Sequence, residues 1–168
     1  RIMGIFENYD DVKKIGSIRS CRIYYCYFAL EWDAIYVHFG QSKYALDFLK
    51  SDKIDNVGSY QSVANSIFFR TTDRVAPHNC FIDGAGIKKG IKELGYRKNY
   101  KKDYNSHFQF ADEGTKVDLA SKKIANKVEL GYPVNKPWFE YDAATGLYKR
   151  FQYGKAHIDD QNNEQLSC

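Results

Sequence analysis

Residues 15–40 read IGSIRSCRIYYCYFALEWDAIYVHFG, and this stretch carries the clearest structural pattern of the chain. Four apolar side chains recur there at the i, i+3, i+4, i+7 spacing of a helix. They are Cys21, Tyr24, Tyr25 and Phe28. Further apolar residues cover the adjoining face, which predicts a buried central helix over Cys21–Glu31, with Ser17 or Ser20 as its N-cap. Ala34–Phe39 then predicts a short buried strand.

Segments on both sides of this stretch alternate between strand and helix patterns. Ile2–Glu7 and Ser66–Arg70 are strand candidates, whereas Gln41–Lys50 and Asp83–Leu94 have helical patterns. The residues expected to face inward from the first of these helices are Tyr44, Ala45, Phe48 and Leu49. Such an alternation is typical of α/β layering, and it predicts one domain over residues 1–95.

The pattern changes after residue 95. Residues 96–114 are aromatic, basic and irregular, which predicts a linker or a long loop. Residues 115–168 predict antiparallel strands, and the clearest hairpin joins Trp138–Tyr141 to Leu147–Tyr153. The expected fold class is therefore mixed, α+β or α/β, with a strand–helix–strand–helix layer followed by a mainly antiparallel β region.

Both ends of the chain read as ordered sequence. The first residues, RIMGIFE, have the pattern of a core strand, and the last, NNEQLSC, read as a strand that has just begun. We therefore expect a fragment cut at both ends, with any export signal or lipid anchor outside it. No apolar run reaches the roughly 18 residues that a transmembrane helix needs.

The composition is that of a globular chain with a mild positive charge. Apolar residues make up 43% of it, which suffices for a core, and 25 basic against 21 acidic side chains give a net charge of +4. The densest basic run is Lys88–Lys102, where solvated surface is the favoured interpretation and a polyanionic partner the alternative. Basic and acidic residues are interspersed, so we expect no nucleic-acid partner.

The cysteines predict buried thiols rather than a disulfide framework. Their positions are Cys21, Cys26, Cys80 and Cys168. None forms a CxxC pair, so we expect neither a zinc site nor a thioredoxin-like site. A spacing of five residues on one helix points Cys21 and Cys26 to different faces, which disfavours a bond between them. We expect no metal and no cofactor.

Arginines near a predicted helix start suggest anion binding. Arg19 and Arg22 lie where backbone N–H groups and the helix dipole favour anions. Arg70 and Arg74 come at and after the strand candidate that ends at residue 70. Guanidinium groups in such positions bind phosphate or carboxylate. In the alternative interpretation they pair with acids and seal a polar part of the core. Those acids are Glu31, Asp33 and Asp73.

Two histidines are the candidates for proton transfer. His38 ends a predicted strand and His78 lies in a Pro-containing loop, so both can reach a cleft at strand ends. As a general base, His38 needs an orienting carboxylate, which Glu31 or Asp33 can supply. The alternative is a neutral histidine that is hydrogen-bonded to the backbone.

Three blocks of residues together resemble a known family. The first contains Ile15-Gly16, Ile18-Arg19-Ser20, Arg22, Ala34, His38, Gly40 and Ser42. The second contains Arg70, Arg74 and Ala76-Pro77-His78-Asn79. The third contains Trp138, Tyr141-Asp142, Tyr148, Arg150, Gly154 and Asp159 or Asp160. In this order the blocks are similar to the YerB-type family of bacterial lipoproteins, a domain family of unknown function. Ser17 departs from the family pattern, which often has proline there.

The resemblance implies a location at the outer face of a bacterial membrane, through an upstream lipidated cysteine. It implies no activity. We expect a cell-surface domain that binds an anionic or glycan component of the cell envelope. The expected ligand-binding residues are Arg19, Ser20, Arg22, His38, Arg70, Arg74, His78 and Asn79. One alternative is a hydrolase or transferase acting on cell-wall polymers, with His38 as general base and Glu31 and His78 as further catalytic candidates. A structural or assembly module is the other, and we favour binding over catalysis.

Overall fold

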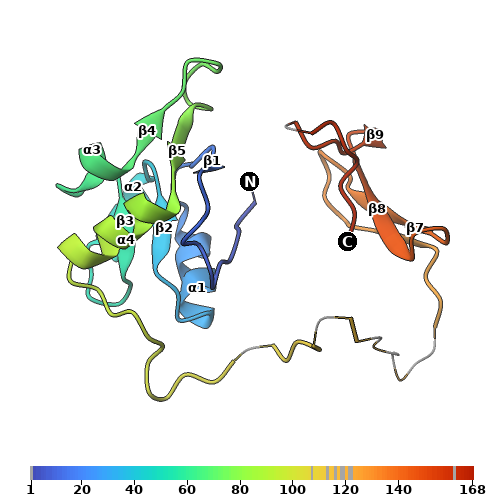
Figure 1. Ribbon diagram of the computed structural model, residues 1–168, viewed down its shortest axis with the longest axis horizontal. Coiled ribbons are helices and arrows are strands. Elements are labelled where there is room, and N and C mark those ends of the chain that lie inside the picture. The colour runs from blue at the N-terminus through green and yellow to red at the C-terminus, as the bar shows by residue number, and fades with distance from the viewer. Residues whose placement is uncertain are drawn as a thin grey trace. The chain divides into compact units, whose positions relative to one another are not determined.

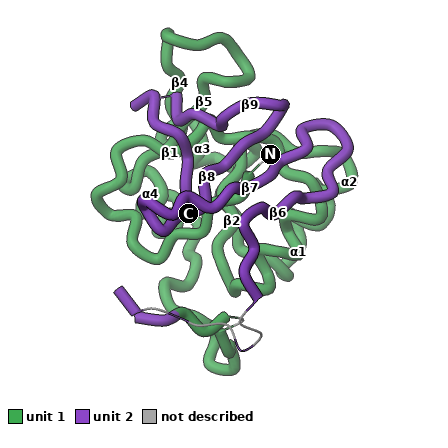
Figure 2. Tube along the Cα trace, turned by 90° about the vertical axis from the view of Figure 1, so that its right-hand side faces the viewer, with its two compact units in different colours: residues 1–110 green, residues 111–168 purple. Residues whose placement is uncertain are grey.

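The computed structural model describes residues 2–106, 108–112, 114, 115, 117, 120, 123–160 and 162–168. The chain divides into two compact units, residues 1–110 and residues 111–168, drawn in two colours in Figure 2. The sequence pattern predicts the boundary between the two parts of the chain in the linker at residues 96–114. Within the predicted β region of residues 115–168, residues 116, 118, 119, 121, 122 and 161 lie outside the described residues.

Unit 1 is a mixed layer of short strands and helices (Figure 1). Its elements are β1 (Ile15–Gly16), α1 (Ile23–Glu31), β2 (Tyr36–His38), α2 (Lys43–Leu49), β3 (Asn56–Gly58), α3 (Ala64–Ile67), β4 (Phe69–Arg70), β5 (Cys80–Ile82) and α4 (Gly84–Glu93). β2 and β3 pair in parallel through the α2 crossover. β5 lies between β1 and β4, and pairs with both in antiparallel fashion.

The core of unit 1 consists of two apolar clusters. One lies where α1 packs on α2, and it contains Cys21, Cys26, Ala29, Ala45, Leu49 and Ile54. The other joins β3, β5, α3 and α4, and it contains Val57, Val63, Ile67, Ile82, Ile87 and Ile91. α4 begins as expected, because the Asp83 side chain accepts a hydrogen bond from the Gly86 N–H at 2.7 Å.

Two expectations about the first fifty residues are wrong. Ile2–Glu7 forms no strand, and Ile2, Ile5 and Phe6 are exposed, because alternation makes a strand only where a partner edge accepts its hydrogen bonds. α1 buries one stripe, chiefly Cys26 and Ala29, whereas Tyr24, Tyr27 and Phe28 are exposed because α2 covers a single side. Arg22, not a serine, is its N-cap residue and makes no side-chain cap.

The expectations for the helix at Gln41–Lys50 and the strand at Ser66–Arg70 are correct only in part. In α2, Ala45 and Leu49 are buried as expected, but Tyr44 is 84% exposed. Ser42 is the N-cap, and its hydroxyl accepts from the Ala45 N–H. The strand expected at Ser66–Arg70 is limited to β4, because residues 64–67 form the short helix α3.

A buried acidic side chain ties distant segments of unit 1 together. The Asp33 side chain is 6% exposed and accepts two hydrogen bonds from Arg97, at 2.6 and 2.8 Å. It also accepts the Lys101 backbone N–H at 2.6 Å. The same guanidinium lies 3.4 Å from the Asp55 carboxylate. Arg97 thus joins the end of α1 to the segment before β3.

Unit 2 is a four-stranded antiparallel sheet. Its strands, in spatial order, are β6 (Lys127–Glu129), β7 (Trp138–Asp142), β8 (Leu147–Gln152) and β9 (Lys155–Ala156). The predicted hairpin is confirmed as β7–β8, in which the Trp138 and Phe151 rings stack with centroids 4.9 Å apart. The expected C-terminal strand consists of isolated bridges, Lys149 with Ser167 and Ile158 with Gln165.

Replacing Arg97 should destabilise unit 1 strongly. Arg97→Met leaves the buried Asp33 carboxylate without its main cation, so we expect the free energy of unfolding to fall by roughly 3 kcal/mol. Denaturant unfolding measures this change. The control Lys89→Met removes only the exposed pair with Glu93 and should cost no more than about 0.5 kcal/mol. Equal losses in the two variants would show that the buried pair has no special role.

Candidate functional site

The candidate site is centred on the loop that joins β4 to β5. Phe69 pairs with Phe81 and Arg70 with Cys80, so the strands hold both ends of the loop at residues 71–79. The Thr71 N–H donates to the Asn79 carbonyl at 2.9 Å, and the Asn79 amide returns a bond to the Thr71 carbonyl at 3.0 Å. The loop projects from one end of unit 1 in both views (Figures 1 and 2). Side chains on it are therefore accessible.

Arg70 is positioned at the base of this loop. Its guanidinium donates to the Asn79 Oδ1 at 2.6 Å. The same group lies over the Phe39 ring, 5.1 Å from the centroid, a distance typical of a cation–π contact. Two partners therefore restrict the orientation of an exposed arginine.

Arg19 reaches the same loop from a different part of the chain. Its Nη1 donates to the Nδ1 of His78 at 2.7 Å, and because arginine only donates, this imidazole nitrogen must be the acceptor. The Arg19 carbonyl accepts from the Phe39 N–H at 3.1 Å. Arg19 and Arg70 therefore contact the consecutive residues His78 and Asn79, and both contact Phe39.

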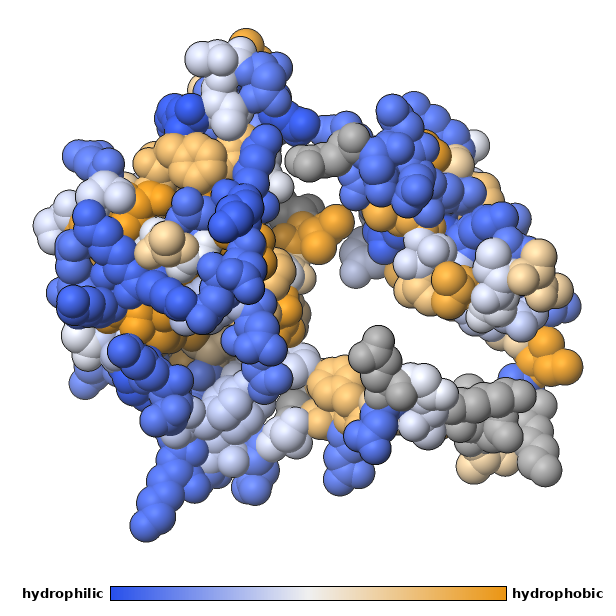
Figure 3. Space-filling view, viewed as in Figure 1, coloured by the Kyte–Doolittle hydropathy of each residue, from blue (hydrophilic) through white to orange (hydrophobic). Residues whose placement is uncertain are grey.

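These residues form what we call the basic hairpin face, defined as Arg19, Arg70, Arg74, His78 and Asn79. Arg74 pairs with its neighbour Asp73 at 3.3 Å. Of the three arginines of the basic hairpin face, Arg74 therefore has a carboxylate beside its guanidinium group. Hydrophilic and neutral side chains dominate the projecting end of unit 1 in Figure 3. The second sequence block and Arg19 are thus brought together.

Backbone hydrogen bonds explain how residues far apart in sequence meet here. Residues 18–21 run between β5 and the end of β2. The Ile18 N–H donates to the Cys80 carbonyl at 2.7 Å, and the Cys21 N–H donates to the Gly40 carbonyl at 2.8 Å. Ser42 completes the set by donating its N–H to the Cys21 carbonyl at 3.1 Å. We call residues 18–21 the connecting segment.

Ser20 and Arg22 belong to the surroundings of this segment rather than to the loop. A Cβ built on Gly40 would lie 2.8 Å from the Ser20 Oγ, and Gly40 has a φ of +81°, so glycine is required for this close approach. The Arg22 Nη1 donates to the Cys21 carbonyl at 3.0 Å, at the start of α1. Both side chains are half-buried.

His38 lies inside the protein, so the expectation that it faces an open cleft is wrong. Its side chain is fully buried, with Nδ1 2.8 Å from the Gly40 carbonyl and Nε2 3.3 Å from the Asn56 Oδ1. Its ring stacks on Tyr36. A Cβ on Gly58 would lie 2.5 Å from the imidazole, which shows how tightly it is enclosed.

The electrostatics of His38 favour the neutral ring. Burial lowers the pKa of His38, and this effect exceeds the opposite effect of the hydrogen bonds to Gly40 and Asn56. Neither of the two acids expected to orient the ring is positioned to do so. Asp33 binds Arg97, and Glu31 is exposed at the end of α1. His38 therefore matches the backbone-bonded alternative, not a general base.

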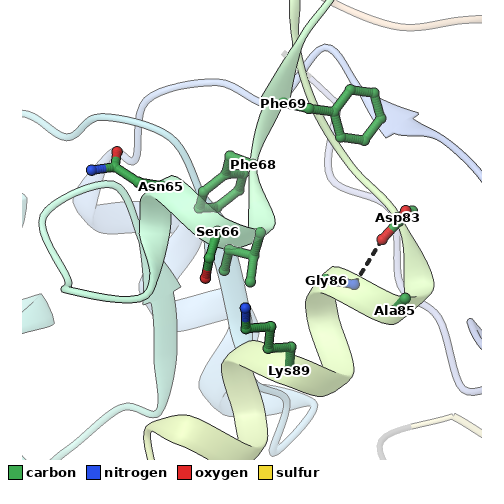
Figure 4. A pocket seen from close by; sticks show the side chains of 9 residues that line it. Asn65, Ser66, Phe68, Phe69, Asp83, Ala85, Gly86 and Lys89 are labelled. Atoms are coloured by element: carbon green, nitrogen blue, oxygen red, sulfur yellow. Dashed lines mark hydrogen bonds between the residues drawn. The ribbon is translucent and has the colours of Figure 1, made fainter.

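A pocket lies beside the basic hairpin face rather than within it. It occupies about 450 Å³ between α3, β4 and the start of α4, and Figure 4 shows the side chains around it. Asp83 is committed to the helix cap, as the dashed line to Gly86 shows, and Lys89 points toward α3. None of the residues predicted to bind a ligand lines this pocket.

The described residues contain no group of three or more histidine, cysteine or acidic side chains arranged to hold a metal ion.

The sequence analysis missed Phe39 as a site residue. Its only signal is its position next to His38 within the first block, and nothing in a sequence says that an arginine thirty residues later will lie over its ring.

Comparison with known proteins identifies the family. The model described as the N-terminal domain of a protein of unknown function, DUF3048, matches residues 1–97. The chain belongs to the DUF3048 family. "Putative lipoprotein YerB" from Bacillus subtilis (strain 168) is 29% identical to this DUF3048 chain over 175 residues, which cover 99% of the chain and 49% of that protein. The resemblance drawn from the three sequence blocks is thereby confirmed.

The fold is confirmed by a solved structure. The crystal structure of YerB from Bacillus subtilis aligns with a TM-score of 0.68 and 24% sequence identity, over 92% of this chain and 50% of that one. The likeness supports the mixed α/β class. The DUF3048 chain spans about half the length of the relative that it matches. Within the described part of the chain, no helix is both long and apolar enough to cross a membrane.

Because the pKa of His38 is lowered in the folded state, its protonation should oppose folding. The unfolded chain then binds the proton more readily, so stability is complete above the unfolded pKa near 6.5 and falls as the pH drops below it. Replacing His38 by glutamine should reduce the slope of unfolding free energy against pH between about 7 and 5. One proton contributes at most about 1.4 kcal/mol per pH unit.

Denaturant unfolding at several pH values measures this slope. His157 also has a pKa lowered by burial, but it is half-buried whereas His38 is fully buried, so His157→Gln serves as the control and should keep most of the slope. An unchanged slope in His38→Gln would contradict the assignment of His38 as a neutral buried residue.

Proposed function

We propose that this DUF3048 chain binds an anionic polymer of the bacterial cell envelope through the basic hairpin face. One observation carries the proposal: Arg19 and Arg70 are held next to each other by the consecutive residues His78 and Asn79. The two arginines come from separate segments, and the connecting segment brings them together.

The partners of these arginines leave their positive charge in place. His78 accepts through a ring nitrogen and Asn79 through an amide oxygen, so neither contact supplies a carboxylate. Arg97, which stabilises the fold, is different, because its guanidinium group pairs with two aspartates, Asp33 and Asp55. The planar guanidinium matches phosphate and carboxylate groups in a two-bond geometry. An anion is therefore the ligand chemistry that this face suits best.

The fixed orientation of the Arg19 and Arg70 side chains also favours anion binding. Ordering a long side chain on binding costs about 0.5–1.5 kcal/mol for each residue. Arg70 is already restricted by Asn79 and the Phe39 ring, and Arg19 by His78, so much of this cost is met before a ligand arrives. The polymer would replace or extend these hydrogen bonds along the exposed edge of the loop.

An anionic polymer fits this face better than a neutral glycan. Neutral sugars commonly stack on an open aromatic face, and the ring that Arg70 contacts, Phe39, is half-buried with the guanidinium over it. Catalysis by His38 forms no part of the proposal, because that ring is enclosed and both of its nitrogens face internal acceptors.

The proposed location is the outer face of the bacterial membrane. The support is the curated relative, whose name describes it as a lipoprotein. A lipid-anchored domain there lies within reach of the wall polymers, and the exposed loop of unit 1 is the part that we assign to contact them.

Removing both positioned charges should weaken binding to cell walls. We expect Arg19→Gln/Arg70→Gln to raise the Kd on the order of 100-fold, because each charge-assisted hydrogen bond contributes about 1.5–3 kcal/mol. Co-sedimentation with purified Bacillus subtilis walls, before and after extraction of their phosphate-containing polymers, measures the affinity. Binding should also decrease as salt increases.

A matched control separates this face from general charge. Lys92→Gln/Lys98→Gln removes the same two positive charges from exposed positions elsewhere in unit 1, and it should leave the Kd within about 3-fold. Equal weakening in both double variants would overturn the assignment of the site. Binding to extracted walls as tight as to intact ones, or to phosphatidylglycerol vesicles instead of walls, would overturn the choice of ligand.

A further inference from the structure

Two cysteines that the sequence assigns to different helix faces lie against each other in the core of unit 1. The Sγ atoms of Cys21 and Cys26 are 3.4 Å apart, and both residues are fully buried. The expectation that their spacing separates them is wrong, because α1 begins at Ile23 and Cys21 therefore precedes the helix.

The connecting segment determines where the first thiol lies. Cys21 forms an isolated parallel bridge with Gln41, and its backbone N–H and carbonyl bond to Gly40 and Ser42. Cys26 lies on the buried stripe of α1, in the same apolar cluster. Two independent backbone elements thus hold the sulfur atoms in van der Waals contact.

We propose that Cys21 and Cys26 form an intramolecular disulfide when this chain folds under oxidising conditions. The S–S bond is about 2.05 Å long, so the sulfur atoms must approach by a little more than 1 Å from their separation as thiols. Rotation about the two Cα–Cβ bonds would bring the sulfur atoms to this distance.

The oxidant in this proposal is a low-molecular-weight disulfide. The thiolate of one cysteine attacks a sulfur of the oxidant and releases one thiol of the oxidant, and a mixed disulfide remains. The second thiolate then attacks the cysteine sulfur of that mixed disulfide and releases the other thiol. The two protons that leave Cys21 and Cys26 end on the two released thiols, so one oxidant disulfide is reduced for each protein disulfide formed.

Burial determines when this exchange takes place. Neither sulfur is accessible in the folded unit, so the oxidant must react before α1 packs on α2. The resulting disulfide should then resist reduction until the unit unfolds. Disulfides persist in oxidising compartments, which include the cell-surface location proposed above, but the chemistry does not depend on the proposed ligand.

The other cysteines offer no competing pair in unit 1. Cys80 is buried in β5, where burial raises the pKa of its thiol. Cys168 is exposed and belongs to unit 2. The folded unit holds the sulfur atoms of Cys21 and Cys26 in contact, so folding favours the link between these two thiols, and peptide analysis can recognise it.

The test uses the full chain, unfolded in denaturant with reductant and then refolded in a mixture of oxidised and reduced glutathione. After refolding, the free thiols are alkylated under denaturing conditions and the peptides are analysed by mass spectrometry. We expect a Cys21–Cys26 link, with Cys80 and Cys168 alkylated. Alkylation of all four cysteines, or a link that involves Cys80 or Cys168, would overturn the proposal.

Stability gives a second measurement. The disulfide closes a short loop, so the oxidised chain should melt roughly 5 °C above the reduced chain. Cys168→Ser should keep this difference and Cys26→Ser should abolish it. If Cys26→Ser does not fold, the peptide analysis of the natural chain still decides the question. Wall binding is not measured in either experiment, so failure here is distinct from failure of the proposed function.

Discussion

The hydrogen bonds of the connecting segment are the constraint on which the rest of unit 1 depends. Residues 18–21 bond to β5 at one end, through Ile18 and Cys80, and to the turn after β2 at the other, through Cys21 and Gly40. The parallel pair β2–β3 and the antiparallel sheet β1–β5–β4 share no ladder. This segment therefore links them, and it places Arg19 beside the projecting loop and Cys21 beside α1.

Charged and polar groups fall into two kinds according to what surrounds them. Asp33 is buried and its cost of desolvation is offset by Arg97 and the Lys101 N–H, so this group stabilises the fold. Arg70 is exposed and Arg19 half-buried, and both donate to neutral partners, so these contacts leave the two positive charges without a carboxylate. His38 shows the intermediate case, a buried ring kept neutral because solvation is lost.

The local patterns were sufficient wherever neighbours in sequence decide the structure. Asp83 caps α4, and the hairpin at residues 138–152 forms around its turn, because capping and hairpin closure are short-range effects. The failures at Ile2–Glu7 and Tyr44 have a common cause. Periodicity states which residues share a face, but only packing partners determine whether that face is covered.

The mixed fold class, the family and the residue types of the candidate site follow from local spacing and from motifs that lie in order along the chain. Which of those residues meet depends on the folded arrangement. It brought Arg19 to His78 across 59 positions, enclosed His38, and set Cys21 against Cys26. The physical reason is that backbone hydrogen bonds between distant segments orient side chains, and no periodicity records those partners.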